Sequence, residues 1–182
     1  MKEQLYYDAE SLAWIFAKSG LSMKEQSLIV NGIYQADLKR LHPRYRKSKL
    51  KLVREVSARQ EWILHHRELE DEVPTAIQDM NDIHPGEDAV LHFLDENQHV
   101  ERFFKSVRLQ LLFLPGKAYV RAKLRTIMKE YGYKRRSEKF QQYLEECLRY
   151  YRIKVFLKGG NEIAIRDAKV DDMLILRIIG RK

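Results

Sequence analysis

A short polar segment in the last third of the chain carries side chains whose chemistry suits nucleic acid. Lys139 and Gln142 stand three residues apart, and in a helix this spacing puts both on one face. In the major groove, Gln pairs bidentately with adenine and Lys with guanine. Arg135 and Arg136 precede Ser137 at the start of the same segment, where cations and backbone N–H groups of a helix N-terminus suit phosphates. This set predicts a helix that reads base edges while its N-terminus contacts phosphates.

Two helices are expected around this segment. The first carries an apolar stripe at helical spacing, formed by Val120, Leu124, Ile127, Met128 and Tyr131. The second carries the stripe Phe140, Leu144, Cys147, Leu148 and Tyr151. Gly132 suits the left-handed position that ends a helix, and Ser137 suits the N-cap of the next. The pattern therefore predicts a helix up to residue 131, a tight connection, and a helix over 137–151.

After this second helix the apolar period changes from 3.6 to 2. Over 152–166 apolar and basic residues alternate around Gly159-Gly160, which supplies the positive φ angles of a hairpin turn. The apolar run Met173 to Ile179 has the length of a third strand. A terminal helix capped by Asp171 is the alternative, because periodicity alone does not separate the two.

The order helix, turn, helix, hairpin resembles the winged helix-turn-helix superfamily over about residues 100–179, at the level of architecture and without a specific family. A generic pair of packed helices is the alternative. The resemblance implies that helix 137–151 enters the major groove and that the basic wing 152–166 contacts the flanking backbone or the minor groove. The nucleic-acid-binding residues expected are Arg121, Lys123, Lys134, Arg135, Arg136, Ser137, Lys139, Gln142, Lys154, Lys158 and Asn161.

The positive charge of the chain is concentrated in this region. Residues 117–166 hold 14 Lys or Arg against 5 Asp or Glu, a balance of +9, whereas the whole chain is +8. The remaining residues therefore sum to −1. A basic excess confined to one supersecondary unit is the electrostatic pattern expected of a nucleic-acid-binding module.

A second basic run lies in the first third of the chain. From 39 to 54 there are 8 basic residues and no acid, whereas 61–101 holds 12 acids and one arginine. Either the run contacts phosphates, or it pairs with the acidic segment within the molecule or in a symmetric dimer. The residues of this second basic contact are Lys39, Arg40, Arg44, Arg46, Lys47 and Lys49.

The N-terminal part is expected to be helical. Asp8 to Ser19 has the pattern of a short amphipathic helix, Ser22 with Glu25 forms a capping box that opens a helix to about Leu41, and Ser48 suits the N-cap of a third helix to about Glu72. Pro85 suits the first position of a fourth helix that extends to Leu114. We therefore expect a mainly α fold with a small C-terminal β-hairpin or sheet, divided into a helical region over 1–84, which dimerises or makes the second basic contact, and a winged-helix-like domain over 85–182.

The residues that would mark an enzyme are poorly arranged. His92, Asp95, Glu96 and His99 share one helical face, but a di-iron site needs a second Glu-x-x-His motif, which the chain lacks. Asp167-Ala168-Lys169 has the acidic-x-Lys spacing of some metal-dependent nucleases without the upstream partner. There is no P-loop, dinucleotide-binding or Gly-x-Ser-x-Gly motif. We expect no catalytic residue, no metal and no cofactor.

The composition is that of an ordinary globular protein, with 45% hydrophobic and 33% charged residues. The sequence shows no signal peptide and no apolar run of membrane-spanning length, so we expect a cytoplasmic protein without a membrane partner. The single cysteine, Cys147, lies on an apolar stripe and is expected to be a buried thiol. The sequence thus predicts a non-enzymatic protein that binds nucleic acid, duplex DNA in the first place, as a regulator or accessory factor. The alternative is a scaffold subunit whose winged unit docks an acidic protein partner.

Overall fold

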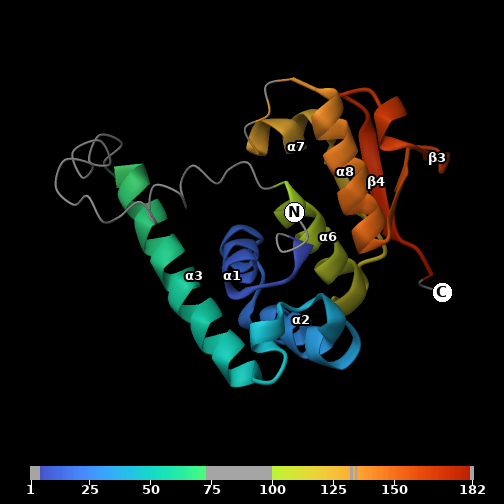
Figure 1. Cartoon of the computed structure of the whole chain (residues 1–182). Coiled ribbons are helices and arrows are strands. Elements are labelled where there is room, and N and C mark those ends of the chain that lie inside the picture. The colour runs from blue at the N-terminus through green and yellow to red at the C-terminus, as the bar shows by residue number, and fades with distance from the viewer. Residues whose placement is uncertain (1–4, 73–99, 132, 134, 181–182) are drawn as a thin grey trace.

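The structure, a computed structural model, describes residues 5–72, 100–131, 133 and 135–180. The described chain is mainly α-helical and ends in a small four-stranded antiparallel sheet (Figure 1). This confirms the predicted fold class of helices followed by a small C-terminal sheet.

Three α-helices form the N-terminal part: α1 (Ala9–Lys18), α2 (Met23–Ala36) and α3 (Lys49–Glu72). Each begins at a side chain that accepts a hydrogen bond from an otherwise unpaired backbone N–H of the first turn. Asp8 caps α1 at 2.7 Å, Ser22 and Glu25 form the predicted capping box of α2, and the Ser48 hydroxyl accepts from α3 at 3.2 Å. Helix α2 ends at Ala36, earlier than predicted, and the chain continues in two short 3₁₀ turns, Leu38–Arg40 and Pro43–Tyr45.

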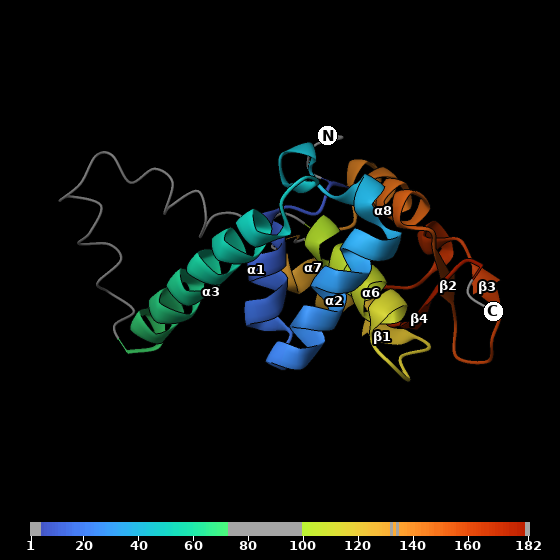
Figure 2. The same ribbon diagram turned by 90° about the horizontal axis from the view of Figure 1, so that it is seen from below.

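Helix α3 packs on α1 and then extends away from the rest of the molecule (Figures 1 and 2). Leu52 and Val56 are buried in this contact. The apolar residues of α3 recur at heptad-like spacing as a stripe along the helix, but Val53 and Leu64 of this stripe are 39% and 41% exposed. The stripe is therefore buried only where α1 lies beside it.

Helix α6 (Glu101–Phe113) lies at the centre of the described molecule, with α1 and α2 on one side and α8 and the sheet on the other (Figure 2). It corresponds to the last part of the helix predicted from Pro85, and residues 73–99 lie outside the described ranges. Its buried side chains include four charged ones: Glu101, Arg102, Lys105 and Arg108. Because buried charges are costly unless they are paired, this helix needs partners from both sides.

The sheet joins segments that are far apart in the sequence. Its strands are β1 (Val120–Lys123), β2 (Ile153–Phe156), β3 (Glu162–Ile163) and β4 (Met173–Ile178). Their order is β1-β4-β2-β3, and every neighbouring pair is antiparallel. The predicted third strand at the C-terminus is thus confirmed, and it occupies the position between β1 and β2.

The prediction of a continuous helix up to residue 131 is wrong in its first turn. Val120 pairs with Leu176 and Lys123 with Met173 in the sheet, and α7 (Leu124–Glu130) begins only after this strand. The residues of β1 turn their side chains alternately inward and outward, so the apolar Val120 faces the core in a strand as well as it would in a helix. Pairing with β4, which the local pattern does not contain, decides between the two.

The hairpin between β2 and β3 has a longer loop than the predicted two-residue turn. Phe156 pairs with Glu162, and the Leu157 backbone N–H donates to the Asn161 carbonyl at 2.9 Å. Gly159 and Gly160 have φ angles of 119° and 91°, so the expected positive φ values are confirmed. Beyond β3 the chain enters a 3₁₀ turn, Ile165–Asp167, where an alternating strand was predicted.

Helix α8 (Glu138–Tyr151) follows the prediction closely. Ser137 is its N-cap, and its hydroxyl accepts from the Phe140 N–H at 3.2 Å. The predicted apolar stripe is buried from Phe140 to Tyr151 and packs on α6. Gly132, predicted to end the preceding helix, lies outside the described residues.

Candidate nucleic-acid interface

The exposed side of α8 carries polar and basic side chains along the whole length of the helix. Lys139 and Gln142 are exposed, as predicted from the opposite apolar stripe. Arg149 and Arg152 are exposed as well, and Arg149 follows Gln142 by seven residues, about two helical turns, which returns it to the side of the helix that carries Gln142. The predicted site residues include neither arginine, although the predicted wing 152–166 begins at Arg152 and helical spacing from Gln142 would have found Arg149. We call Arg135, Ser137, Lys139, Gln142, Arg149 and Arg152 the α8 surface.

The N-terminus of α8 presents one of its two arginines to solvent. Arg135 is exposed, whereas the Arg136 guanidinium donates to the backbone carbonyls of Ala168 and Ile165, the latter at 2.6 Å. Arg136 therefore fixes the loop after β3 against the start of α8. Lys134 lies outside the described residues.

The hairpin places its basic residues in two different settings. Lys154 on β2 forms an ion pair with Glu162 across the strands, with 2.8 Å between Nζ and Oε2. Lys158 and Asn161 are exposed beside the two loop glycines. The hairpin tip is thus accessible to a ligand, whereas the charge of Lys154 is partly neutralised by Glu162.

Arg121 and Lys123 do not join the α8 surface. They lie on β1, which β4 separates from β2, and their side chains are exposed on the face of the sheet away from the core. The predicted set therefore divides between the α8 surface with the hairpin tip and a second site on the sheet.

The second basic run is used largely within its own loop. Arg46 donates to the carbonyls of Leu41 and Lys39 at 2.8 and 2.9 Å, Arg44 pairs with Glu55 at 2.9 Å, and Lys49 hydrogen-bonds Asn31. Lys39 and Lys47 have exposed side chains.

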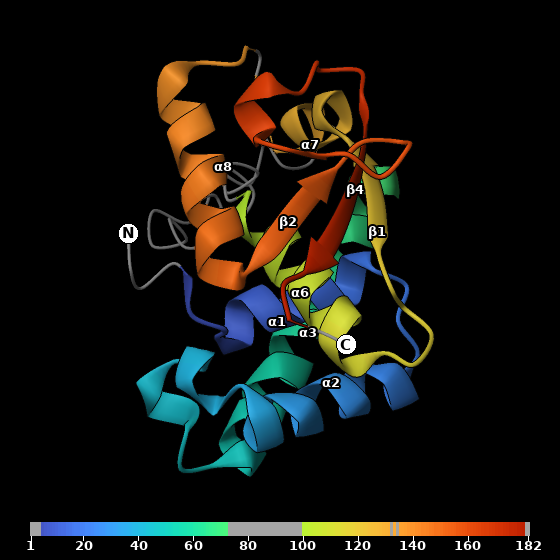
Figure 3. The ribbon, with the colours of Figure 1, turned by 90° about the vertical axis from the view of Figure 1, so that its right-hand side faces the viewer.

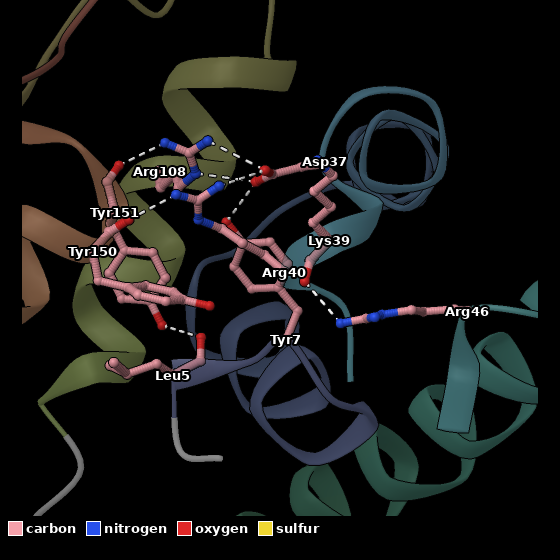
Figure 4. Close-up of polar contacts among 9 residues, drawn as sticks. All are labelled: Leu5, Tyr7, Asp37, Lys39, Arg40, Arg46, Arg108, Tyr150 and Tyr151. Atoms are coloured by element: carbon pink, nitrogen blue, oxygen red, sulfur yellow. Dashed lines mark hydrogen bonds and ion pairs between the residues drawn. The ribbon is translucent and has the colours of Figure 1, made fainter. Parts of the chain in front are cut away.

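Arg40 takes part in a buried network centred on Asp37 (Figure 4). Its guanidinium bonds Asp37 at 3.1 Å and donates to the Tyr150 carbonyl at 2.8 Å. Arg108 of α6 lies beside it, donates from Nε to Asp37 at 3.0 Å and reaches the Tyr151 carbonyl at 2.6 Å. Two cations from different elements thus bind the last carbonyls of α8, where the helix dipole favours positive charge.

The tyrosines of this network connect it to the N-terminus. The Tyr7 hydroxyl donates to Asp37 at 3.0 Å, and the Tyr151 hydroxyl donates to the Leu5 carbonyl at 2.5 Å. Burial, and then the Asp37 carboxylate, raise the pKa of Tyr7 well above its usual value. Although burial alone would lower it, the hydrogen bond to Asp37 holds the pKa of Arg108 above its ordinary value. The network stays an ion pair with neutral tyrosines around it.

A contact between α6 and α8 fixes the middle of α8. The Tyr143 hydroxyl donates to the buried Glu101 carboxylate at 2.7 Å. Cys147 is fully buried beside this contact, and burial raises the pKa of its thiol, so the predicted buried thiol is confirmed. With capping at both ends and this contact between them, α8 is held along its inner side.

Among the described residues, no group of three or more His, Cys, Asp or Glu side chains is arranged to hold a metal ion. The candidate His92, Asp95, Glu96 and His99 lie outside the described ranges, and Asp167 stands in the 3₁₀ turn after β3. In the described ranges no helix is both long enough and apolar enough to cross a membrane. Comparison of the chain with protein-family models, curated proteins and solved structures found no match in any of the three.

Proposed function

We propose that this chain is a non-enzymatic nucleic-acid-binding protein that docks duplex DNA with the α8 surface and the β2–β3 hairpin, as a regulator or accessory factor. The observation that carries the proposal is the α8 surface itself. Lys139, Gln142 and Arg149 follow one exposed side of a helix whose opposite side is packed on α6. A helix held in this way presents its outer side chains in fixed positions, which base-edge contacts require.

The element order supports a winged helix-turn-helix type of docking. Helices α7 and α8 follow one another, the hairpin comes directly after α8, and β4 returns between β1 and β2. In helix-turn-helix proteins the second helix lies in the major groove, with its N-terminal residues at the base edges. By this analogy α8 is the recognition helix and the hairpin is the wing.

Each exposed residue has a contact that its chemistry favours. Gln142 would pair with adenine and Lys139 with guanine, while Arg135, Arg149 and Arg152 would lie along the phosphates. Lys158 and Asn161 at the hairpin tip would contact the flanking backbone or the minor groove. Arg136 acts indirectly by holding the N-terminus of α8 to the loop after β3.

A protein-docking scaffold is the competing function, because acidic side chains on α8 would repel the phosphates of DNA. Glu138 is exposed, and Glu145 and Glu146 are partly exposed on the same helix as Lys139 and Arg149. Arg166 pairs with Glu145 at 3.5 Å, which neutralises one of them. In this reading the mixed surface would bind an acidic protein that its lysine and arginine side chains recognise.

A salt series with matched variants tests the proposal. We expect the full chain to bind duplexes of unrelated sequence with log K falling by about 0.9 per phosphate neutralised against log salt. The variant Lys139→Ala/Arg149→Ala should lose affinity and show a shallower slope. The control Lys24→Ala/Arg54→Ala removes one Lys and one Arg from exposed positions of α2 and α3 and should bind like the parent chain.

The same assay separates the two functions. Equal losses in the two variants would place the binding outside α8 and overturn the proposal. Binding of a polyglutamate peptide in preference to duplex, lost in the Lys139→Ala/Arg149→Ala variant, would instead support the scaffold.

A further inference from the structure

The sheet has an outer face that lies beyond the α8 surface and the hairpin-tip residues Lys158 and Asn161 to which the proposed function assigns contacts. Figure 3 shows β1, β4 and β2 turned toward the viewer, with α6 behind them and no described helix in front. Alternate residues of each strand point to this side because side chains alternate across a strand. We call this surface the outer sheet face, and its main side chains are Tyr119, Arg121, Lys123, Lys154, Phe156 and Arg177.

The strand register places these side chains in adjacent rows. On opposite sides of β4, Arg121 and Phe156 both pair with Ile175, and Lys154 pairs with Arg177 in the next row. Neighbouring strands lie about 4.8 Å apart, so Arg121 and Phe156 are separated by about 10 Å across the sheet. Phe156, Ile175 and Arg121 thus form one row across the three strands.

The outer sheet face is positively charged. Arg121, Lys123 and Arg177 are exposed, and the acid paired into the sheet on this side, Glu162, already binds Lys154. Three cations therefore remain over a small area that also displays aromatic side chains. Charge of this sign attracts a phosphate backbone.

Two aromatic rings on this face lie under arginines. The Arg177 guanidinium lies 5.3 Å from the Phe156 ring centre, and that of Arg121 lies 5.0 Å from the ring centre of Tyr119, which is 40% exposed. Arginine planes and aromatic rings are the surfaces on which unstacked bases rest in proteins that bind single strands. In a duplex the faces of the bases are stacked on one another inside the helix. A duplex would therefore contact the cations of this surface but would place no base on the aromatic rings.

We propose that the outer sheet face binds single-stranded nucleic acid, with bases stacked on Phe156, Tyr119 and the arginines above them, and phosphates beside Lys123 and the outer guanidinium groups. This site is separate from the α8 surface and does not depend on it. An acidic peptide would match the charge, but it would leave the aromatic rings and Ile175 uncovered, so the aromatic content favours a single strand.

Binding of an unstructured oligothymidylate of about 12 nucleotides, a length within the site sizes of single-strand-binding proteins, tests this proposal. We expect the full chain to bind it with log K falling by about 0.7 per phosphate against log salt. Phe156→Leu/Arg177→Gln keeps an apolar side chain on β2 but removes one stack, and should weaken binding by about tenfold or more. The control Lys24→Gln/Arg54→Gln should bind like the parent chain.

A second set of measurements separates this site from α8. Lys139→Ala/Arg149→Ala should retain oligothymidylate binding whether or not it loses duplex binding, so the two proposals stand or fall independently. Ultraviolet crosslinking to the oligonucleotide, followed by mass spectrometry, should label peptides that contain Tyr119 or Phe156. Crosslinks confined to α8, unchanged binding by Phe156→Leu/Arg177→Gln, or tighter binding of polyglutamate than of the oligonucleotide at equal charge would each overturn the assignment.

Discussion

Asp37 is a buried carboxylate that faces two arginines and a tyrosine from three parts of the chain. Its side chain is 5% exposed, and that of Arg108 is 8% exposed. Removing charges from water costs several kcal/mol per ion, and this cost is offset only when the pairing and hydrogen bonding are nearly complete. Both oxygens of Asp37 are bonded, and the spare donors of the arginines reach the last carbonyls of α8. The network therefore links the N-terminal helices to the proposed recognition helix.

Replacing Asp37 by Ala should destabilise the protein strongly. The change leaves Arg108 and Arg40 side by side without their counter-charge, and breaking a buried pair in this way costs about 3–5 kcal/mol. Urea unfolding measures the loss. The matched control is Asp171→Ala, which breaks a bidentate pair with Arg125 whose side chains are 61% and 64% exposed and should have little effect. Equal effects of the two changes would contradict the structural role of the network.

Arg152 is a residue in which backbone strain and proposed function coincide. It has φ 54° and ψ 45° in the left-handed region after α8, a conformation that costs a residue with a Cβ about 1–2 kcal/mol. Glycine is the usual residue at such a position. Here the position is held by an exposed arginine, and strained residues cluster at functional sites.

Arg152→Gly should stabilise the protein and weaken duplex binding. The relief of strain exceeds the extra backbone entropy of glycine by about 0.5–1 kcal/mol, to be measured by urea unfolding. Loss of one phosphate contact should make the slope of log K against log salt shallower by about 0.9. Arg152→Lys keeps both the strain and the charge and should change neither quantity. Unchanged duplex affinity in Arg152→Gly would remove this residue from the α8 surface.

At the scale of elements, the features that could be predicted are those with a local physical cause. Ser137 and the stripe that begins at Phe140 define α8 within its own residues, because a cap and an amphipathic pattern act over a few turns. Strand β1 could not be recognised, since Val120 becomes a strand residue only by pairing with Leu176. The β4 prediction succeeded because its short apolar run has the length of a strand, although its place in the sheet depends on that same distant pairing.

The candidate site was predictable to a similar extent. Exposure of Lys139 and Gln142 follows from the apolar stripe on the other side of α8, so it could be inferred locally. Arg136 and Arg40 lie in basic stretches of the sequence, like the arginines that are exposed on the surface. In the fold, however, they donate to backbone carbonyls of distant segments. A sequence does not distinguish an arginine that binds phosphate from one that binds a carbonyl, because the acceptor is supplied by the tertiary fold.

The contact between α2 and α6 depends on a helical glycine. Gly32 lies in α2 directly against the Phe113 ring, so an added Cβ would overlap the ring atoms. In an isolated helix Gly→Ala is favourable by about 1 kcal/mol. Here steric overlap in a packed contact should reverse the sign, at a cost of about 1–3 kcal/mol. We therefore expect Gly32→Ala to lower the free energy of unfolding measured in urea.

A double-mutant cycle checks this explanation. Phe113→Ala removes the ring, so adding Gly32→Ala to it should restore the favourable effect of alanine in a helix. The sign of the Gly32→Ala effect should therefore differ between the two backgrounds. The same penalty in both would show that the ring is not the cause.

At the scale of the whole molecule, the core is rich in tyrosines that connect its parts. The chain has ten tyrosines. In eight of them the pKa is raised, and burial is the largest cause. For Tyr45 the value is about 12, with its hydroxyl donating to Glu55 at 2.6 Å. The others are Tyr7, Tyr34, Tyr131, Tyr133, Tyr143, Tyr150 and Tyr151. They come from the N-terminal part of the chain, from the connection between α7 and α8, and from α8 itself, so their protonation is linked to the fold as a whole.

The protein should therefore lose stability steeply in alkali. Above the unfolded tyrosine pKa of about 10 the unfolded chain releases protons that the folded chain keeps, so the free energy of unfolding falls as pH rises. Each fully buried tyrosine, such as Tyr7 or Tyr151, contributes about 1.4 kcal/mol per pH unit to this fall. For Tyr45 the contribution is complete below pH about 10 and is lost as pH rises toward about 12. Tyrosinate absorbance and helical circular dichroism, followed together, should change in one transition in this range, whereas the chain in urea should titrate smoothly near pH 10. Ionisation of most tyrosines before the helices are lost would show that these hydroxyls are open to solvent in the folded protein.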